Sequence, residues 1–290
     1  MRFAIFGNPS LSKLTGNEQN LFRLLDSLKD EISVDDTYLQ FLNKNTDWAI
    51  PYTDVIKDND FSADVVISIG GDGTFLRTAS RVGDKGIPMI GINTGRLGFL
   101  ADVTSDRMES VVRLINDGNY TLQKKNLLEI FMEGLPKGYS PYALNDIAIL
   151  KHDISSMISI RTEVDGIPLV TYQADGLVIS TPTGSTAYSL SIGGPVITPG
   201  TNVFELTPVA PHSLTMRPIV LSHDQVISLS IMSRSNSFLV SIDGHSFSCP
   251  DNTKIEIRRA PFQISVMKPD GQDFFSTLRE KMIWGVDNRQ

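Results

Sequence analysis

The spacing of apolar residues changes near residue 120, and this change divides the chain into two kinds of structure. Before it, short apolar runs that suit buried strands alternate with stretches in which apolar residues recur at helical spacing. Strands are expected at residues 3–6, 65–69 and 89–92, and helices over Leu21–Leu28, from Thr74 onward and near 108–115. Such alternation is typical of a mostly parallel sheet flanked by helices.

After residue 120 the pattern becomes one of strands and tight turns. Two Asp-Gly pairs, Asp165-Gly166 and Asp243-Gly244, interrupt alternating apolar segments, as hairpin turns do. The second part of the chain is therefore predicted to be mostly β. The segment Phe274–Trp284 returns to helical spacing after a Pro-Asp-Gly break.

The glycine-rich turn Gly70–Gly73 directly follows the predicted strand at 65–69 and precedes a predicted helix. Glycines let another molecule approach the backbone, and the N-terminus of the helix offers free N–H groups to an anion. Asp72 is out of place among groups arranged for phosphate, unless it holds Mg2+ or accepts a hydroxyl proton. The alternative is that Asp72 is an ordinary N-terminal cap of the helix.

Composition limits the partners of this chain of 290 residues. The net charge is −7 and no block of like charges occurs, so neither nucleic acid nor an anionic membrane surface is expected as a partner. One cysteine, Cys249, excludes an internal disulfide framework and fits a reducing compartment. No segment has the length and apolar character of a signal peptide or a membrane span, so we expect a cytoplasmic protein.

The segment Ala174–Pro195 is rich in hydroxyl groups and is bracketed by glycine and proline. Its serines and threonines are too dense for an apolar interior, and they suit a ligand that carries many oxygens. The motifs of P-loop nucleotidases, Rossmann dehydrogenases and zinc proteases are absent from the sequence. Of the four histidines, His152 and His223 lie beside Asp in polar stretches and are predicted at the surface. For His212 and His245, a role in ligand binding and a role in packing are equally expected.

The Gly70–Gly73 turn, the segment 93–100, the Asn145-Asp146 pair and the hydroxyl-rich segment together resemble the NAD kinase family. The resemblance runs from Gly70 to about His245. It implies ATP-dependent phosphorylation of NAD on the 2′-hydroxyl of its adenosine ribose, with Mg2+ or another divalent cation accompanying ATP. It also implies self-association as a dimer or tetramer.

The expected fold has an N-terminal α/β domain with a mostly parallel sheet and a C-terminal β-rich domain. The expected nucleotide-binding domain covers residues 1–118, joined by 268–290, and the expected dinucleotide-binding domain covers 119–267. By the same resemblance, the C-terminal helix returns to the first domain.

Asp72 is expected to accept the proton of the 2′-hydroxyl. In a phosphoryl transfer with a loose transition state this proton leaves late, so Asp72 needs position more than basicity. Gly71 and Gly73 keep the backbone accessible to ribose and phosphate. The resemblance and the residue chemistry together assign substrate contacts to Gly71, Gly73, Arg77, Asn93, Phe99, Asn145, Asp146, Asp175, Ser185, Thr186, Ala187, Tyr188, Ser189, Leu190, Ser191, Ala210 and His245, and no resident metal ligand is expected.

Several of these roles have plain structural alternatives. Arg77 is either a phosphate contact or a solvated charge on a helix face, and the Asn145-Asp146 pair is either a ligand site or a polar entry to a strand. Gln173 falls at a family position that bears on the choice between NAD and NADH, and its neutral side chain leaves both substrates open.

Three other functions share some of these features. Diacylglycerol-type lipid kinases have a Gly-Gly-Asp-Gly loop, but the hydroxyl-rich segment and the lack of a membrane-binding face argue against them. Phosphofructokinase-type enzymes need basic residues around a second phosphate, which the second half does not clearly supply. A non-enzymatic dinucleotide sensor would not need Asp72.

Overall fold

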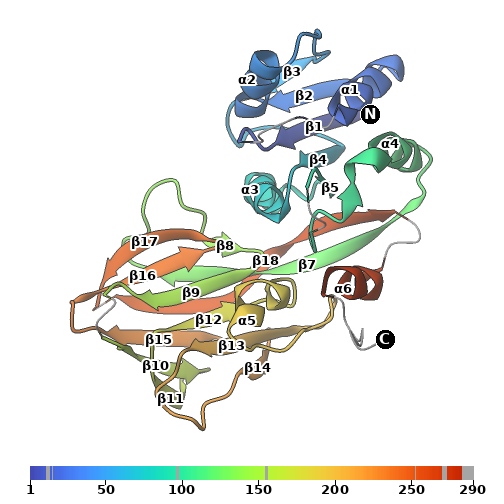
Figure 1. Ribbon diagram of the computed structural model, residues 1–290. Coiled ribbons are helices and arrows are strands. Elements are labelled where there is room, and N and C mark those ends of the chain that lie inside the picture. Colours follow the sequence, from blue (N-terminus) through green and yellow to red (C-terminus); the bar gives the residue numbers. More distant parts are fainter. Residues whose placement is uncertain are drawn as a thin grey trace, which may run out of the picture. The chain divides into compact units, whose positions relative to one another are not determined.

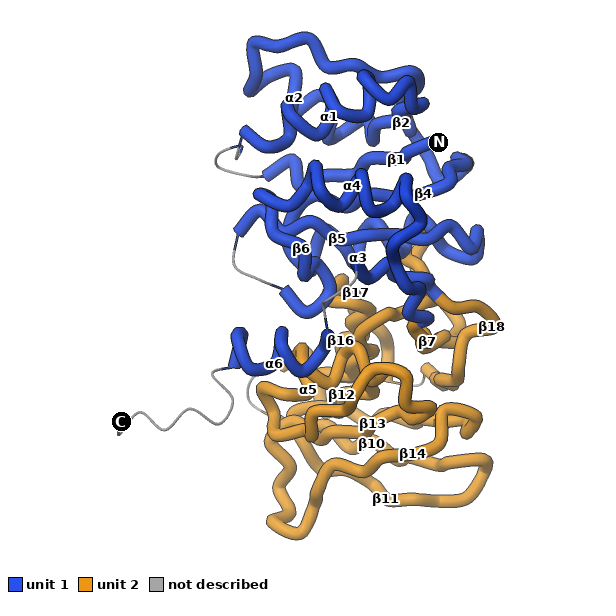
Figure 2. The backbone as a smooth tube through the Cα atoms, turned by 90° about the vertical axis from the view of Figure 1, so that its right-hand side faces the viewer, with its two compact units in different colours: residues 1–124, 264–290 blue, residues 125–263 orange. Residues whose placement is uncertain are grey.

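The computed structural model describes residues 1–10, 14, 16–95, 98–153, 156–251, 253–269 and 273–282. It divides the chain into two compact units, coloured separately in Figure 2: unit 1 is residues 1–124 with 264–290, and unit 2 is residues 125–263. Two long strands, β7 (Tyr120–Met132) and β18 (Lys254–Pro269), continue from one unit into the other, so the unit boundaries fall within strands.

Unit 1 has the predicted α/β architecture, with a parallel sheet in the order β3-β2-β1-β4-β5 (Figure 1). The last part of β18 adds to β5 in parallel through Val266 and Met89, and β6 pairs with β5 in parallel. The strands are β1 (Arg2–Gly7), β2 (Glu31–Asp35), β3 (Asp54–Ile56), β4 (Val65–Ile69), β5 (Met89–Asn93) and β6 (Val103–Thr104). The helices are α1 (Asn17–Ser27), α2 (Asp36–Asn45), α3 (Asp72–Val82), α4 (Met108–Asn116) and α6 (Phe274–Met282), with short 3-10 turns at Gly83–Lys85 and Ser105–Arg107.

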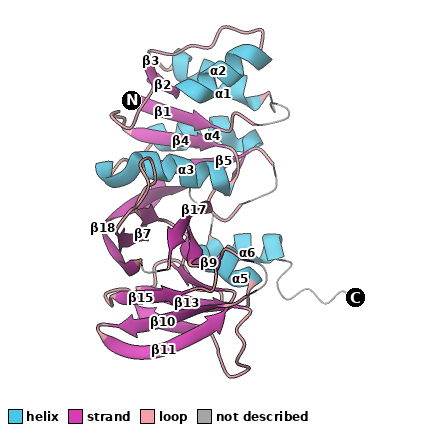
Figure 3. Cartoon of the chain, turned by 90° about the vertical axis from the view of Figure 1, so that its left-hand side faces the viewer, coloured by secondary structure: helices cyan, strands magenta, loops and turns pink. Residues whose placement is uncertain are grey.

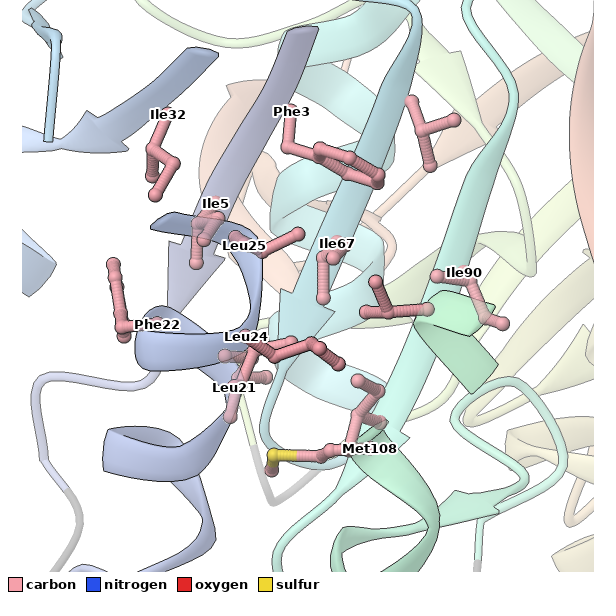
Figure 4. Close-up of a cluster of buried hydrophobic side chains, with 14 of the residues drawn as sticks. Phe3, Ile5, Leu21, Phe22, Leu24, Leu25, Ile32, Ile67, Ile90 and Met108 are labelled. Atoms are coloured by element: carbon pink, nitrogen blue, oxygen red, sulfur yellow. The ribbon is translucent and has the colours of Figure 1, made fainter. Parts of the chain in front are cut away.

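The core of unit 1 follows from alternation along its strands. Phe3, Ile5 and Ile67 point to one face, where Leu21 and Leu25 of α1 pack against them, as Figure 4 shows. The opposite face is covered by α3, whose Thr78 hydroxyl donates to Ser68 of β4. Helices thus cover both faces, and ligands of such sheets bind at the carboxyl ends of the strands.

Unit 2 is almost entirely antiparallel β structure (Figure 3). One sheet has the order β14-β13-β12-β9-β16-β17, and in the other β11-β10-β15-β18 are neighbours, with β7 pairing with β18 and β8. The strands of the first sheet are β9 (Asp146–Lys151), β12 (Gly176–Ser180), β13 (Val203–Val209), β14 (Ile219–Ser222), β16 (Ser237–Ile242) and β17 (His245–Pro250). The remaining elements are β8 (Tyr142–Ala143), β10 (Ile158–Val164), β11 (Ile167–Ala174), β15 (Ile227–Met232), a 3-10 turn at Gly184–Thr186 and the short helix α5 (Tyr188–Ser191).

Both Asp-Gly pairs form the predicted two-residue hairpin turns. Asp165 and Gly166 join β10 to β11, Asp243 and Gly244 join β16 to β17, and all four residues have positive φ. Asp and Gly tolerate this conformation better than other residues, which is why the pair marks such turns.

Some local predictions were wrong or incomplete. Leu28 lies beyond the end of α1 and is 43 % exposed, so it does not extend the apolar face of that helix. Strands β2 and β3 and helix α2 were not predicted. Ile283 and Trp284 of the predicted tail helix, and Arg96 and Leu97 of the segment 93–100, lie outside the described residues.

Candidate active site

The turn between β4 and α3 is shaped by its glycines. Gly70 has a φ of +153°, and a β-carbon on it would lie 2.4 Å from the Thr74 hydroxyl, so only glycine fits. Gly71 is the N-cap residue of α3, and a β-carbon on it would meet no atom within 4 Å. Among the residues that the structure describes, no packing contact therefore requires glycine at 71, which leaves its backbone accessible to a ligand.

Asp72 is not the N-terminal cap of α3. It is the first helical residue, and the structure records no side-chain cap on that helix. Its carboxylate instead accepts three backbone N–H groups: Phe99 at 3.0 Å on Oδ2, and Leu100 and Ala101 at 3.1 and 3.0 Å on Oδ1. These bonds fix the carboxylate, while the side chain stays 31 % exposed.

The loop that holds Asp72 is itself anchored by Asn93 at the end of β5. The Asn93 amide donates to the carbonyl of Ala101 at 3.2 Å, and its Oδ1 accepts the N–H of Gly95 at 2.7 Å. Asn93 is 3 % exposed. This predicted substrate contact is therefore a buried group that holds the loop.

Within the described part of the chain, two cationic side chains lie near the turn. Arg77 donates to the Thr74 hydroxyl at 3.2 Å, which keeps its guanidinium beside the first turn of α3. The ammonium of Lys281, from α6, lies 3.7 Å from Oδ2 of Asp72 and 4.4 Å from the centre of the Phe99 ring. The contacts of Lys281 were not predicted from the sequence.

In unit 2, Asp243 organises the Asn145-Asp146 pair. Its carboxylate accepts the backbone N–H groups of Leu144, Asn145 and Asp146 at 2.8, 2.8 and 3.1 Å. Asn145 precedes β9 and Asp146 begins it, and Oδ1 of Asn145 is buried without a hydrogen-bond partner in the described structure. A buried, unpaired amide oxygen is costly, and a ligand hydroxyl would satisfy it.

The Asp146 carboxyl group has a perturbed acidity. Burial, and to a smaller extent the negative charge of Asp243, raise its pKa to about 7. Burial also raises the pKa of Asp243, although the three backbone N–H groups and the nearby His245 oppose that rise. Asp146 is 7 % exposed, so near neutral pH this buried carboxyl group exists in both its protonated and its ionised form.

Some hydroxyl groups of the hydroxyl-rich segment form hydrogen bonds inside unit 2. Ser189 is fully buried and donates to Glu205 Oε1 at 2.9 Å, and Thr207 donates to the same oxygen at 2.5 Å. Ser185 is also fully buried and donates to the Pro182 carbonyl at 2.8 Å. Glu205 was not predicted from the sequence, although a charged residue within the apolar strand β13 indicates a buried polar partner.

The same segment is fastened to the Asn145-Asp146 pair. Thr181 donates from its N–H to the Asn145 carbonyl at 2.9 Å and from its hydroxyl to the Leu144 carbonyl at 2.6 Å. A β-carbon on Gly184 would lie 2.1 Å from the Asn145 carbonyl oxygen, so glycine is needed for this close approach.

Other predicted residues are open to a ligand. Tyr188 is 37 % exposed, and burial raises the pKa of its hydroxyl, with added contributions from the charges of Asp146 and Asp175. Asp175 pairs with Lys151 at 2.7 Å. Thr186, Ala187 and Leu190 are half-buried, and Ser191, Ala210 and His245 are exposed.

These residues span a length suited to an extended ligand. Asp146 and Lys151 are the two ends of β9, and the Lys151 N–H donates to the Asp175 carbonyl at 2.8 Å. The six residues of β9 span five residue steps, which cover roughly 17 Å. Ala210 has a positive φ of 43°, which is uncommon for alanine and marks a strained position at the end of β13.

One prediction about the histidines was wrong. His223 is 6 % exposed, lies 6.2 Å from the Phe204 ring and contacts the Asn126 amide at 3.2 Å. The imidazole ring is buried within unit 2, with a polar contact to Asn126, although its sequence neighbours are polar. His212 is exposed, and its N–H donates to the Gln173 carbonyl at 2.8 Å.

Within the described ranges, no three His, Cys, Asp or Glu side chains come together in a way that could hold a metal ion. No helix in those ranges has the length and apolar character that a membrane crossing requires.

Comparison with known proteins identifies relatives of both units. The family model of the ATP-NAD kinase N-terminal domain matches residues 11–120, and that of the ATP-NAD kinase C-terminal domain matches 144–268. An NAD kinase of Bacteroides fragilis is 52 % identical over 289 residues and an NAD kinase of Porphyromonas gingivalis 41 % over 286, covering 100 % and 98 % of each chain.

Two solved structures share the fold. A yeast NADH kinase complexed with NADH has a TM-score of 0.88 at 22 % identity, covering 100 % of this chain and 89 % of its own. An NAD kinase from Archaeoglobus fulgidus in complex with ATP has a TM-score of 0.76 at 25 % identity, covering 98 % and 99 %.

The fold and the full-length relatives define a nucleotide-dependent phosphotransferase. The chain belongs to the ATP-NAD kinase family. Its reaction is the ATP-dependent phosphorylation of NAD to NADP. The family match begins at residue 11, well before the first motif on which the sequence resemblance rested.

Proposed function

We propose that Asp72 accepts the proton of the 2′-hydroxyl of the NAD adenosine ribose during phosphoryl transfer. The observation that carries this proposal is the fixed and partly exposed carboxylate, which three backbone N–H groups hold beside an open glycine turn. Such a transfer requires a well-positioned base more than a strong one, because the hydroxyl proton leaves late.

The phosphoryl group is transferred in one chemical step. The 2′-oxygen attacks the γ-phosphorus of ATP, the bond from that phosphorus to the bridging oxygen breaks, and ADP leaves. The hydroxyl proton passes to Asp72. The open backbone at Gly71 and Gly73 and the guanidinium of Arg77 favour the approach of phosphate oxygens.

Unit 2 is proposed to bind the dinucleotide. Asn145 and Asp146 offer donors and acceptors for a ribose diol or an adenine edge. Tyr188 offers a ring for stacking, Asp175 and Ser191 offer polar contacts, and the small Ala210 leaves room for a base. Thr186, Ala187, Leu190 and His245 are accessible enough to contact the same ligand.

The buried residues of the predicted set have a different part. Ser185 and Ser189 are proposed to act through the shape of the turn, since their hydroxyl groups are already engaged inside unit 2. Asn93 and the backbone of Phe99 are likewise proposed to position Asp72.

Mg2+ is proposed to enter bound to the phosphates of ATP, as part of the substrate. Both oxygens of Asp72 accept backbone N–H groups, and an ammonium lies 3.7 Å from one of them, which is a poor environment for a metal ligand. When bound, the cation would neutralise charge on the transferring phosphoryl group.

Self-association is proposed to use the outer strand β11. Ile167 and Leu169 on this strand are 70 % and 37 % exposed, and an edge strand with exposed apolar side chains is suited to pairing with a second copy. Light scattering after size-exclusion chromatography tests this: Ile167→Lys should lower the molar mass, and an unchanged mass would remove β11 from the interface.

A cytoplasmic location is also proposed, and the single, buried, unpaired Cys249 supports it.

Incubation with ATP, Mg2+ and either NAD or NADH tests the proposed chemistry. Phosphorus NMR of the product should show a new 2′-phosphate monoester, and NAD that lacks the 2′-hydroxyl should bind without reacting. Phosphorylation at any other hydroxyl would contradict the role given to Asp72.

A further inference from the structure

We propose that Lys281 is a catalytic residue that binds an oxygen of the transferring γ-phosphoryl group of ATP. This inference rests on the role proposed for Asp72. It concerns a residue of the C-terminal helix α6, which no sequence motif pointed to.

One face of helix α6 carries the residues that contact Asp72 and Phe99. Phe274, Leu278 and Lys281 are spaced four and three residues apart, so they share that face. The Phe274 ring lies 6.1 Å from the Phe99 ring, Leu278 is buried, and the Lys281 ammonium lies 4.4 Å from the same Phe99 ring. Asp273 starts the helix by accepting the N–H groups of Phe275 and Ser276 at 2.9 and 3.0 Å.

Phe99 links the two charged groups. Its ring is beneath the ammonium of Lys281, and its backbone N–H donates to Oδ2 of Asp72, the oxygen that faces Lys281. A cation over an aromatic face is held in place without losing its hydrogen-bond donors. Lys281 is therefore positioned while its N–H groups remain available.

The contact between Lys281 and Asp72 is not itself a tight bond. At 3.7 Å it exceeds the usual length of a charge-assisted hydrogen bond, and the side chains are 34 % and 31 % exposed. Such an exposed pair contributes little to stability. Its two members are both open to a ligand, which suggests that their proximity serves the reaction.

The chemistry of the site needs such a cation. The chain has a net charge of −7, and the carboxylate of Asp72 would repel the polyanionic phosphates of ATP. An ammonium beside that carboxylate offsets the repulsion where the new bond forms. As the γ-phosphorus passes to the 2′-oxygen and the proton passes to Asp72, Lys281 stabilises the negative charge on a non-bridging phosphoryl oxygen.

The test compares Lys281→Met, which keeps the length of the side chain, with Lys281→Arg, which keeps the charge. Arg279→Met is the matched control, because Arg279 is an exposed cation on the same helix that contacts Ser276. Steady-state kinetics and calorimetric titration with inorganic tripolyphosphate and with NAD are measured for each, with thermal unfolding as a check of folding.

Lys281→Met should lower kcat/KM for ATP by about 10- to 100-fold and weaken tripolyphosphate binding, while changing NAD affinity less than about threefold. Lys281→Arg should recover much of the loss, and Arg279→Met should behave as the wild type. If Lys281→Met fails to fold, Lys281→Arg and Lys281→Gln decide: the proposal requires that only the former bind tripolyphosphate normally.

Normal ATP kinetics and tripolyphosphate binding in Lys281→Met would reduce the contact to a surface ion pair and overturn the proposal. A raised kcat would also overturn it, by showing that Lys281 restrains Asp72. If the role proposed for Asp72 is wrong, Asp72→Asn will show normal turnover, and this result is distinct from those of the Lys281 variants.

Discussion

Gly98 lies so close to the Asp72 carboxylate that a β-carbon on it would be 1.9 Å from Oδ1. Glycine at this position lets the loop wrap around the carboxylate and present three N–H groups to it. The acid and the loop therefore form one structural element, although they are separated in the sequence.

Gly98→Ala should displace either the carboxylate or the loop. We expect kcat to fall about 10- to 100-fold, because a shift of about 1 Å in a reacting group costs this much or more. Overpacking should also lower the free energy of unfolding by about 1–3 kcal/mol. Kinetics and denaturant unfolding measure both, and a variant with normal kcat would show that the position of Asp72 is less critical than proposed.

Asp243→Asn should disturb the Asn145-Asp146 pair while keeping the hairpin turn, because Asn tolerates the positive φ of 47°. The amide offers one acceptor oxygen in place of two, which leaves a backbone N–H unpaired and lowers the free energy of unfolding by about 1–3 kcal/mol. KM for NAD should rise more than KM for ATP.

Asp165→Asn is the matched control for this change. It occupies the same place in an Asp-Gly turn, but its carboxylate lies at the exposed surface, where it accepts the Val226 N–H and the Gln225 amide. Equal effects of the two substitutions on KM for NAD would show that Asp243 acts only as a turn residue.

Asp146→Asn should change the pH dependence of stability. The carboxyl group has a pKa of about 7 in the folded protein and near 4 when unfolded, so the folded state binds its proton more tightly. The resulting stabilisation is present below about pH 4 and is lost as pH rises to about 7, with a slope of up to about 1.4 kcal/mol per pH unit. Urea unfolding from pH 4 to 8 should show a flatter curve for Asp146→Asn, whereas parallel curves would mean that Asp146 titrates normally.

Tyr188→Ala should weaken NAD binding by about 3- to 10-fold through the loss of stacking, with a smaller effect on KM for ATP. Tyr188→Phe keeps the ring and should bind NAD nearly as the wild type does. Equal losses for NAD and ATP in the alanine variant would argue against a place for Tyr188 in the dinucleotide site.

The predictable parts of the fold were those with strong local signals. The strand at 65–69 and the glycine turn after it combine a buried apolar run with residues that only a turn requires, and both Asp-Gly hairpins follow from backbone conformation. Strand β3 has only three residues, and α2 begins directly after β2, so neither gave a separable pattern.

The site was predicted less completely because several of its parts act over long sequence distances. The contacts of Asp72 with residues 99–101, of Asp243 with 144–146 and of Lys281 with Asp72 depend on tertiary structure. Composition likewise suggested that the hydroxyl groups of 181–191 face a ligand, but a buried carboxylate, Glu205, engages one of them. A single sequence does not show which hydroxyl groups face inward.

The most direct test of the account is the turnover of Asp72→Asn, which keeps the size of the side chain and removes the base. We predict that kcat falls by about 100- to 10,000-fold while the affinity for NAD and the thermal stability stay close to those of the wild type. Near-normal kcat in a folded Asp72→Asn protein would contradict it.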